Sequence, residues 1–253
     1  MITKESYYFE LHWGNRRETP EQCAIRFGRT IDELNALDGV FGQWNKLANT
    51  IEEAQDPFCK VPADQEELIA VFLKKRRRYD YPPDKLWPEM GYSVGAWNGM
   101  DEPFGATIAV HPGTYDAHIA RANSLRLYLS SRRQKTSEPW HGSELASIMR
   151  LLVEAWDTNE ASVACARYQP DSPQNAMGKV LLPRPGWLTY LAPWQLLKVT
   201  PPEGIHVEKL PQGGVICTIC EEPFTIDNPR HIELAEALNQ AMRPIQAFPA
   251  PID

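Results

Sequence analysis

The chain contains one pair of cysteines three positions apart, Cys217 and Cys220. This CxxC spacing serves zinc binding and thiol redox chemistry. Here it falls in Val215–Cys220, a run predicted as a β-strand, and residues three apart on a strand point to opposite faces. No second CxxC and no spaced pair of histidines accompanies it. We therefore predict structural, buried cysteines, with no metal and no cofactor.

His231 lies near the start of a predicted helix, where a histidine can act as a base or as a ligand. Leu234 and Leu238 share its face of the helix, which favours a hydrogen-bonded core histidine. The HExxH, GxGxxG and Walker motifs are absent from the sequence. We therefore predict that the protein is not an enzyme, and a small metal-dependent hydrolase is kept as an alternative. Its titratable groups would be His12, His111 and Asp80.

A nuclease of the restriction type needs Pro-Asp followed by Glu or Gln, one further residue and Lys. The carboxylates hold Mg²⁺, and the lysine assists the attacking water. Pro83-Asp84 and Pro170-Asp171 supply the first part of this pattern. Neither is followed by E-x-K or Q-x-K, and neither tripeptide occurs in the chain. The catalytic set is therefore incomplete.

The basic run Lys74–Arg78 offers five cations that could contact phosphates. A structural role is favoured, because the run lies at the C-terminal end of a predicted helix whose first turn holds Asp64, Glu66 and Glu67. Acidic residues at the N-terminal end and basic residues at the C-terminal end complement the helix dipole. A nucleic-acid-binding module stays a second alternative, and it would need this cluster to meet other basic residues on one surface.

Composition narrows the class of protein. The 253 residues include 26 Lys and Arg and 33 Asp and Glu, which gives a net charge of -7. This charge argues against nucleic-acid binding and suits a basic protein partner. No stretch approaches the roughly 18 apolar residues of a membrane span. Met1–Glu10 contains no continuous apolar segment, so we expect no secretory signal, no membrane partner and a cytoplasmic location.

The predicted elements indicate an α+β fold with mainly antiparallel sheet and about four helices packed on its faces. Hairpin-length connections between consecutive strands support antiparallel pairing. We expect an N-terminal half, 1–130, and a C-terminal half, 140–253, forming one compact unit. The predicted strands are Ser6–Trp13, Tyr92–Trp97, Thr107–His111, Leu125–Leu129, Ser162–Tyr168, Trp187–Leu191, Ile205–Lys209 and Val215–Cys220.

Four helices are predicted from capping signals and periodic apolar residues. Thr19–Gln22 forms a capping box that begins the first helix, and Gly39 ends it. The second runs from Ala63 to about Arg77, and the third over Ser143–Trp156. The fourth begins at Asn228-Pro229 and ends at Pro244. The inward residues of the second helix are Leu68, Ile69, Phe72 and Leu73.

Short motifs spread over residues 6 to 243 resemble the immunity protein fifty-two family of bacterial polymorphic toxin systems. They are Tyr8–Arg16, Glu21–Arg26, Trp44, Gly91–Gly99, Gly186–Leu191, Gly213-Gly214 and Glu222–His231. The resemblance implies an antidote that binds a cognate toxin, of type VI secretion or another polymorphic system. It also implies that the toxin carries a restriction-endonuclease-like domain. A nuclease that grips DNA with basic residues would suit an acidic partner.

The residues that contact the toxin are predicted from charge alone. Acidic residues in predicted loops are candidates, although most surface acids are merely solvated. The candidate toxin-binding residues are Glu52, Glu53, Asp56, Asp101, Glu102, Glu221 and Glu222. Trp13, Trp97, Trp187 and His231 are predicted to be architectural.

Overall fold

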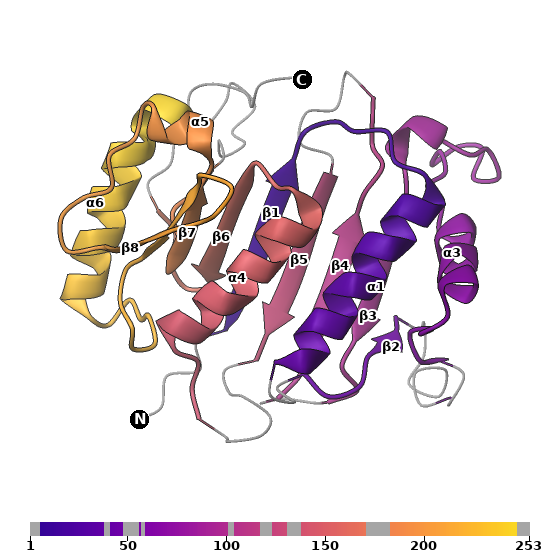
Figure 1. Ribbon diagram of the computed structural model, residues 1–253, viewed down its shortest axis with the longest axis horizontal. Coiled ribbons are helices and arrows are strands. Elements are labelled where there is room, and N and C mark those ends of the chain that lie inside the picture. Colours follow the sequence, from indigo (N-terminus) through magenta and orange to yellow (C-terminus); the bar gives the residue numbers. More distant parts are fainter. Residues whose placement is uncertain are drawn as a thin grey trace. The chain divides into compact units, whose positions relative to one another are not determined.

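The computed structural model describes residues 6–37, 41–47, 56, 59–100, 104–116, 123–130, 138–170 and 183–246. These residues form nine strands and five α-helices, which confirms the α+β class (Figure 1). The elements are β1 (Tyr7–Trp13), α1 (Pro20–Ala36), β2 (Asn45–Lys46), α3 (Gln65–Lys74), η2 (Pro88–Met90), β3 (Val94–Trp97), β4 (Ala106–His111), β5 (Asn123–Leu129), α4 (Gly142–Trp156), β6 (Glu160–Cys165), β7 (Leu188–Leu191), α5 (Pro193–Leu196), β8 (His206–Lys209), β9 (Val215–Thr218) and α6 (Pro229–Gln246).

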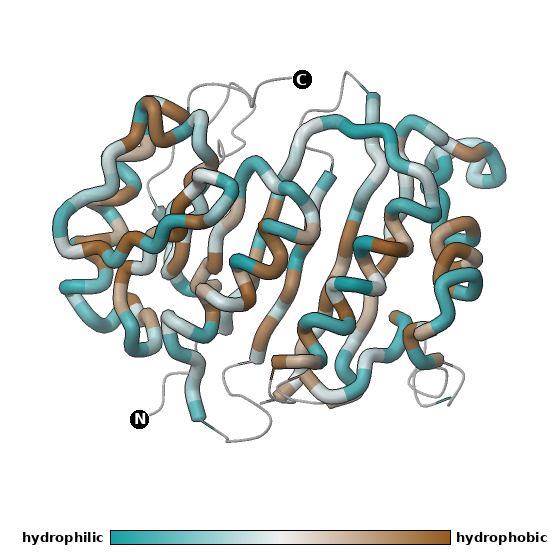
Figure 2. The backbone as a smooth tube through the Cα atoms, in the orientation of Figure 1, coloured by the Kyte–Doolittle hydropathy of each residue, from teal (hydrophilic) through white to brown (hydrophobic). Residues whose placement is uncertain are grey.

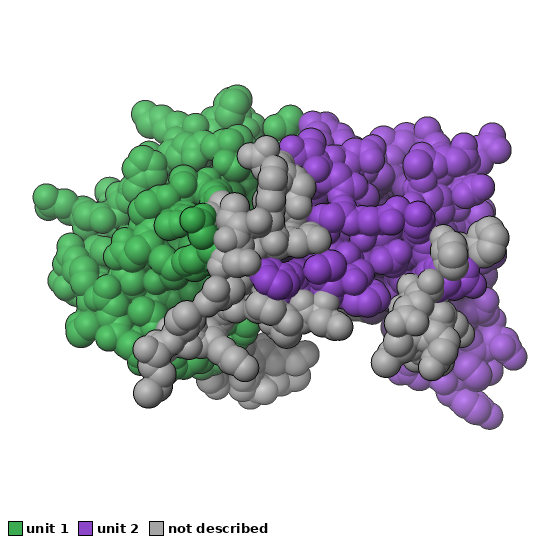
Figure 3. All heavy atoms as spheres, turned by 90° about the horizontal axis from the view of Figure 1, so that it is seen from below, with its two compact units in different colours: residues 1–11, 138–251 green, residues 12–137, 252–253 purple. Residues whose placement is uncertain are grey.

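The chain divides into two compact units (Figure 3). Unit 1 contains residues 1–11 and 138–251, and unit 2 contains residues 12–137 and 252–253. The prediction of halves 1–130 and 140–253 stays a prediction. Each unit is described by itself below.

Unit 2 contains the strand order β2-β3-β4-β5, and each strand is antiparallel to the next. Ile108 and Val110 of β4 are fully buried, whereas the residues between them are half-buried, so one face of this sheet forms the core. Helix α1 lies over this sheet in Figure 1. Its buried Phe27 packs edge-on against Phe72 of α3, with ring centroids 5.9 Å apart.

The predicted capping box begins α1. The Gln22 N–H donates to the Thr19 hydroxyl at 3.3 Å, and the Thr19 N–H donates to the Gln22 side chain at 2.8 Å. These bonds satisfy two backbone donors that helix geometry leaves without partners. Hydrophobic and hydrophilic residues alternate along α1 and along α4, as expected for helices with one apolar face (Figure 2).

Unit 1 contains the strand order β1-β6-β7-β9-β8, with antiparallel pairing along β6, β7, β9 and β8. Every residue of β7 and β9 is buried, which indicates that both faces of these strands are covered. Helix α4 buries Leu152 and Trp156. Trp187 is buried against Tyr7, at a centroid distance of 4.8 Å.

The sequence predicts helix starts better than helix ends. Leu73, predicted inward, is 43% exposed, because α3 buries only Leu68 and Phe72. Helix α3 ends at Lys74 with Lys75 as its C-cap, so only the first two residues of the basic run lie at the helix end. Arg76 and Arg78 instead form isolated β-bridges, with Tyr92 and Leu86.

The prediction that Pro244 ends the last helix is also wrong. Proline removes one helical N–H, but α6 continues to Gln246. The Gln246 amide donates to the Pro183 carbonyl and to Asn239, both at 3.1 Å, and Ile245 is fully buried. These tertiary contacts hold the last residues in the helix. The short elements β2 and α5 were not predicted.

No helix among the described residues has the length and apolar character that a membrane crossing requires.

Candidate protein-binding site

An acidic loop joins β9 to α6 in unit 1 and carries two of the predicted toxin-binding residues, Glu221 and Glu222. We call residues 219–228 the acidic loop. Its end is fixed by the predicted start of α6, because the Asn228 side chain accepts a hydrogen bond from the Arg230 N–H at 3.0 Å. Pro229 follows as the first helical residue.

His231 holds the acidic loop from inside the protein. The imidazole is 2% exposed and stacks on Phe224, at a centroid distance of 5.5 Å. The Thr225 N–H donates to Nδ1 at 3.1 Å, so a neutral ring carries its proton on Nε2. Nε2 lies 2.9 Å from Glu222 Oε1 and donates to it. The prediction of a hydrogen-bonded core histidine is confirmed.

Cys220, Glu222 and His231 bring three potential metal ligands within 4.8 Å of one another. The hydrogen bonds do not suit a metal, because Nδ1 accepts the Thr225 N–H and Nε2 must keep the ring's proton. Burial also raises the pKa of the Cys220 thiol to about 12, which disfavours its thiolate form. The cluster is better described as a buried imidazole that orients a carboxylate by a hydrogen bond.

The two cysteines of the CxxC pair differ in their surroundings. Cys217 is fully buried in β9, and burial raises the pKa of its thiol to about 12. Cys220 lies beyond the end of β9 and is only half-buried, so the prediction that it is a buried strand residue is wrong. Its thiol donates to the Glu222 carbonyl oxygen at 3.3 Å, a contact within the acidic loop.

Glu221 is oriented by the start of α4. Its Oε2 accepts the Ser143 N–H at 3.0 Å, and its Oε1 accepts the Ser143 hydroxyl. A carboxylate at a helix N-terminus is stabilised by the free N–H groups and by the helix dipole. Sequence reasoning missed this contact, because the two residues are 78 positions apart.

Two carboxylates of the acidic loop, Glu221 and Glu222, therefore face solvent in a defined orientation. The Glu222 side chain is 63% exposed, and the hydrogen bond from His231 lowers its pKa, so the group is ionised at neutral pH. Carboxylates held in advance lose little conformational entropy when they accept hydrogen bonds from a partner's Arg or Lys. The arrangement fits protein recognition.

The other predicted toxin-binding residues are less informative. Asp56 belongs to unit 2 and is exposed. The structure places it in a different unit from Glu221 and Glu222. The remaining four lie outside the described residues: Glu52, Glu53, Asp101 and Glu102.

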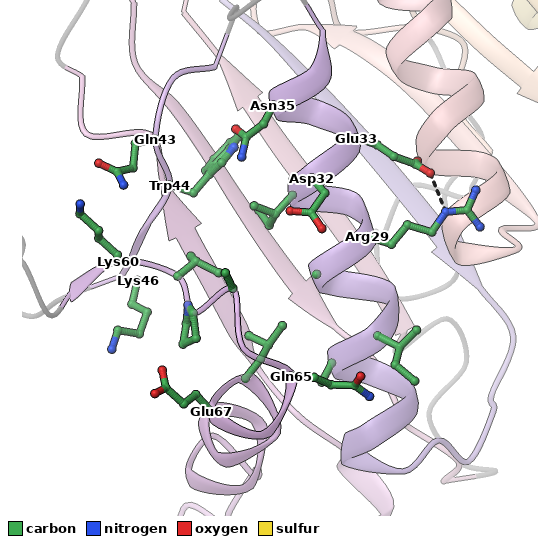
Figure 4. Close-up of a pocket in the computed structure, with 18 of the residues that line it drawn as sticks. Arg29, Asp32, Glu33, Asn35, Gln43, Trp44, Lys46, Lys60, Gln65 and Glu67 are labelled. Atoms are coloured by element: carbon green, nitrogen blue, oxygen red, sulfur yellow. Dashed lines mark hydrogen bonds and ion pairs between the residues drawn. The ribbon is translucent and has the colours of Figure 1, made fainter.

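A groove of about 980 Å³ lies in unit 2, beside α1 (Figure 4). Asp32 and Asn35 project from α1 on one side, and Lys46 and Lys60 lie on the other. Trp44 lies between these sides in Figure 4. Its indole N–H is buried and has no hydrogen-bond partner among the described residues.

The charges of this groove nearly cancel. Arg29 and Glu33 form an ion pair at 2.6 Å, and Asp32 and Glu67 add carboxylates to the two lysines. A groove with both charge signs and one unsatisfied donor can hold a polar protein segment. It offers no single charge that would select a partner, so it ranks below the acidic loop as a candidate site.

The enzyme alternative finds little support in the described residues. His12, His111 and Asp80 do not form a metal-holding group there, since such a group is found only at Cys220, Glu222 and His231. His12 lies on β1, His111 on β4, and Asp80 in an exposed segment after α3.

Gly91–Gly95 reads GYSVG, which fits the GxSxG pattern of a hydrolase nucleophile elbow. An elbow places its serine on a turn between a strand and a helix, whereas Ser93 directly precedes β3 and donates its N–H to the Lys75 carbonyl at 3.0 Å. The β3–β4 register places Ser93 opposite His111. Burial, with Arg77 and Arg126, lowers the pKa of His111 to about 4, which weakens it as a general base.

The comparisons with known proteins agree with a binding role. The family model "Immunity protein 52" matches residues 5–246, so the protein belongs to this family. No curated protein sequence matches the chain. Among solved structures, it is similar to the Pseudomonas aeruginosa T6SS protein PA0821. The TM-score is 0.57 and the identity 9%, covering 94% of this chain and 76% of that one, so the likeness shows the fold alone.

A second solved structure, the substrate-free duplicated taurocyamine kinase from Schistosoma mansoni, gives a TM-score of 0.26 at 10% identity. The match covers 96% of this chain and 33% of that chain. This TM-score carries no argument about fold or function.

Proposed function

We propose that this protein neutralises a cognate toxin by stoichiometric protein–protein binding and performs no catalysis of its own. The observation that carries the proposal is the Immunity protein 52 match across residues 5–246. The site supports it, because the acidic loop presents oriented carboxylates rather than a set of groups suited to chemistry.

We infer further that the toxin is a basic nuclease with a restriction-endonuclease-like domain. The net charge of -7 supports this, because opposite potentials raise the association rate and disfavour wrong partners. The similar solved structure is titled a T6SS protein, which favours a toxin of type VI secretion. A nuclease acts on DNA, so the proposed complex forms in the cytoplasm.

Within this proposal, Glu221 and Glu222 are the first candidates for toxin contact. They accept hydrogen bonds from the toxin's Arg or Lys side chains. Asp56, with Glu52, Glu53, Asp101 and Glu102, completes the proposed acidic set. A standard stable interface buries roughly 1,600 Å² in total, which leaves room for further contacts.

Co-expression with the toxin encoded beside this gene tests the proposal. We expect restored growth of cells that make the toxin, and a complex of defined stoichiometry on size-exclusion chromatography. The purified protein should stop plasmid cleavage by the toxin at equimolar concentration. Cell death in the presence of the folded protein, without co-elution, would contradict the proposal.

Charge reversal tests the proposed contacts. The double variant E221K/E222K should weaken the complex, whereas E203K, at an exposed position of the same unit, should not. Circular dichroism and thermal unfolding check that each variant folds. Unchanged affinity of a folded E221K/E222K variant would remove the acidic loop from the interface and leave the antidote function standing.

A further inference from the structure

One face of the unit 2 sheet is only partly covered. On β4, Ile108 and Val110 are fully buried, whereas Thr107, Ala109 and His111 are half-buried. The partners of these three residues on β5 share that face: Ser124 is half-buried, and Arg126 and Tyr128 are exposed. Antiparallel strands normally alternate in this way when one sheet face contacts solvent.

A hollow of about 490 Å³ lies on this open face. Gly95 and Ala109 are opposite each other in the β3–β4 register, and two such small residues leave space above the sheet. The Leu47 side chain borders Gly95, where an added Cβ would come within 2.3 Å of it. The Cys59 thiol donates to the Lys46 carbonyl at 3.3 Å, which links two lining segments.

The charge of this basic hollow is opposite to that of the whole chain. Lys46 and Lys75 are its charged lining residues, and no described lining residue is Asp or Glu. Arg77 and Arg126 lie close enough to His111 to contribute to its lowered pKa. Nδ1 of His111 is buried and has no hydrogen-bond partner among the described residues. A protein of net charge -7 thus gathers positive potential at one concave place.

We propose that the basic hollow is a docking site for an acidic segment of a protein partner, with an Asp or Glu side chain of that segment entering it. The carboxylate would meet Lys75 directly and Arg126 at the neighbouring strand. The inference rests on the proposed function in one respect, since the partner is taken to be the toxin that the acidic loop also contacts.

A protein carboxylate fits the hollow better than a nucleic acid does. Phosphate backbones are bound by basic stripes that follow several charges along a strand. The hollow is local, its floor is apolar, and the net charge of the chain repels a polyanion beyond it. Opposite charges at two separate surfaces would also fix the orientation of one partner.

Fluorescence anisotropy with labelled peptides tests the chemistry without the toxin. We expect the full chain to bind an octaglutamate peptide and not an octalysine peptide, with binding weakened by salt. K75E should weaken octaglutamate binding roughly tenfold, whereas K209E, at an exposed position on β8, should change it little. A DNA or RNA octamer that binds more tightly than octaglutamate would overturn the proposal.

Filling the hollow separates shape from charge. A109M occupies the floor without changing any charge, and T107M, on the same strand and face, is its control outside the hollow. We expect A109M alone to weaken octaglutamate binding, with thermal unfolding confirming that both variants fold. Equal affinity of A109M and the parent would overturn the proposal. Tighter octaglutamate binding by the E52Q/E53Q variant would indicate that these two glutamates of the chain itself compete for the hollow. That result would also overturn the proposal.

The final experiment measures toxin binding to the same variants by isothermal titration calorimetry. Weaker toxin binding by folded K75E and A109M, with K209E and T107M unchanged, supports the proposal. Full affinity in K75E and A109M would refute docking of the toxin at the hollow and leave the antidote function standing. Failure of the parent protein to bind the toxin would refute the antidote function, and the octaglutamate arm would then decide the hollow by itself.

Discussion

The acidic loop of unit 1 and the basic hollow of unit 2 hold their charges by different means. In the loop, the two candidate carboxylates are oriented by donors from elsewhere in the unit: Ser143 for Glu221 and His231 for Glu222. In the hollow, the two lining cations come from different elements, Lys46 from β2 and Lys75 from the C-cap of α3, and no described lining residue is a carboxylate. The loop carboxylates are therefore held by side-chain and backbone hydrogen bonds, whereas the cations of the hollow are brought together by the packing of separate elements.

This difference has a consequence for stability and binding. Hydrogen bonds that orient the loop also stabilise unit 1, so substitutions there should affect both folding and recognition. Exposed cations contribute little to folding, so removing one from the hollow should affect binding far more than stability. The following predictions test this contrast, in order of expected effect.

Loss of His231 should have the largest effect on stability. H231A removes a buried ring that stacks on Phe224 and leaves the Thr225 N–H without its acceptor. We expect the free energy of unfolding to fall by about 2–4 kcal/mol, measured by urea unfolding with tryptophan fluorescence. H231F keeps an aromatic ring and should cost about 1–2 kcal/mol, from the lost hydrogen bonds alone. A stability of H231A equal to that of the parent would show that the loop does not depend on this residue.

His111 should make the protein lose stability in acid. Its folded pKa of about 4 lies below the value of 6.5 expected for an unfolded chain, so between these values the unfolded state binds more protons. This contribution to stability is complete above pH 6.5 and is lost as the pH falls toward 4. We expect at most about 3 kcal/mol from this group, measured by urea unfolding at several pH values. H111Q should flatten the slope in that range, and H206Q, at an exposed strand position, should not.

Removing the Glu221 carboxylate should destabilise α4 moderately. E221A leaves the Ser143 N–H and hydroxyl without their acceptor at the start of the helix. We expect a loss of about 1 kcal/mol in the free energy of unfolding. E221Q keeps an acceptor and should lose less, and E203A, on the surface of the same unit, should be neutral. A neutral E221A would show that solvent satisfies the start of α4.

The fold was largely predictable because its signals are local. The Thr19–Gln22 capping box and the Asn228-Pro229 start both involve residues within a few positions of each other, and both are confirmed. The Gly, Pro, Asn and Asp residues that divide short apolar runs likewise located β4 and β5. The end of α6 was not predictable, because Gln246 is held by Pro183, 63 positions away.

The candidate sites were less predictable, for the same reason. Charge alone pointed to Glu221 and Glu222, but their orientation depends on partners that only the fold brings near. The basic hollow was not predicted at all. Lys75 ends a helix as predicted, being the C-cap of α3, but the sequence did not show that this helix end lies beside Ser93, near Ala109. Sequence distance hides a site that is built across strands.

The smallest predicted effect is that of E222Q on toxin binding, and it distinguishes the acidic loop from the basic hollow most directly. E222Q removes the charge of an exposed carboxylate while keeping its shape, so we expect roughly threefold weaker toxin binding at low salt and little difference at high salt. The loss should appear in the association rate, measured by surface plasmon resonance, because exposed charges act mainly by steering. E203Q is the matched control.

If A109M changes the dissociation rate while E222Q changes the association rate, the hollow anchors the partner and the loop attracts it. If both variants change the same rate constant, the contrast between the surfaces is not functional.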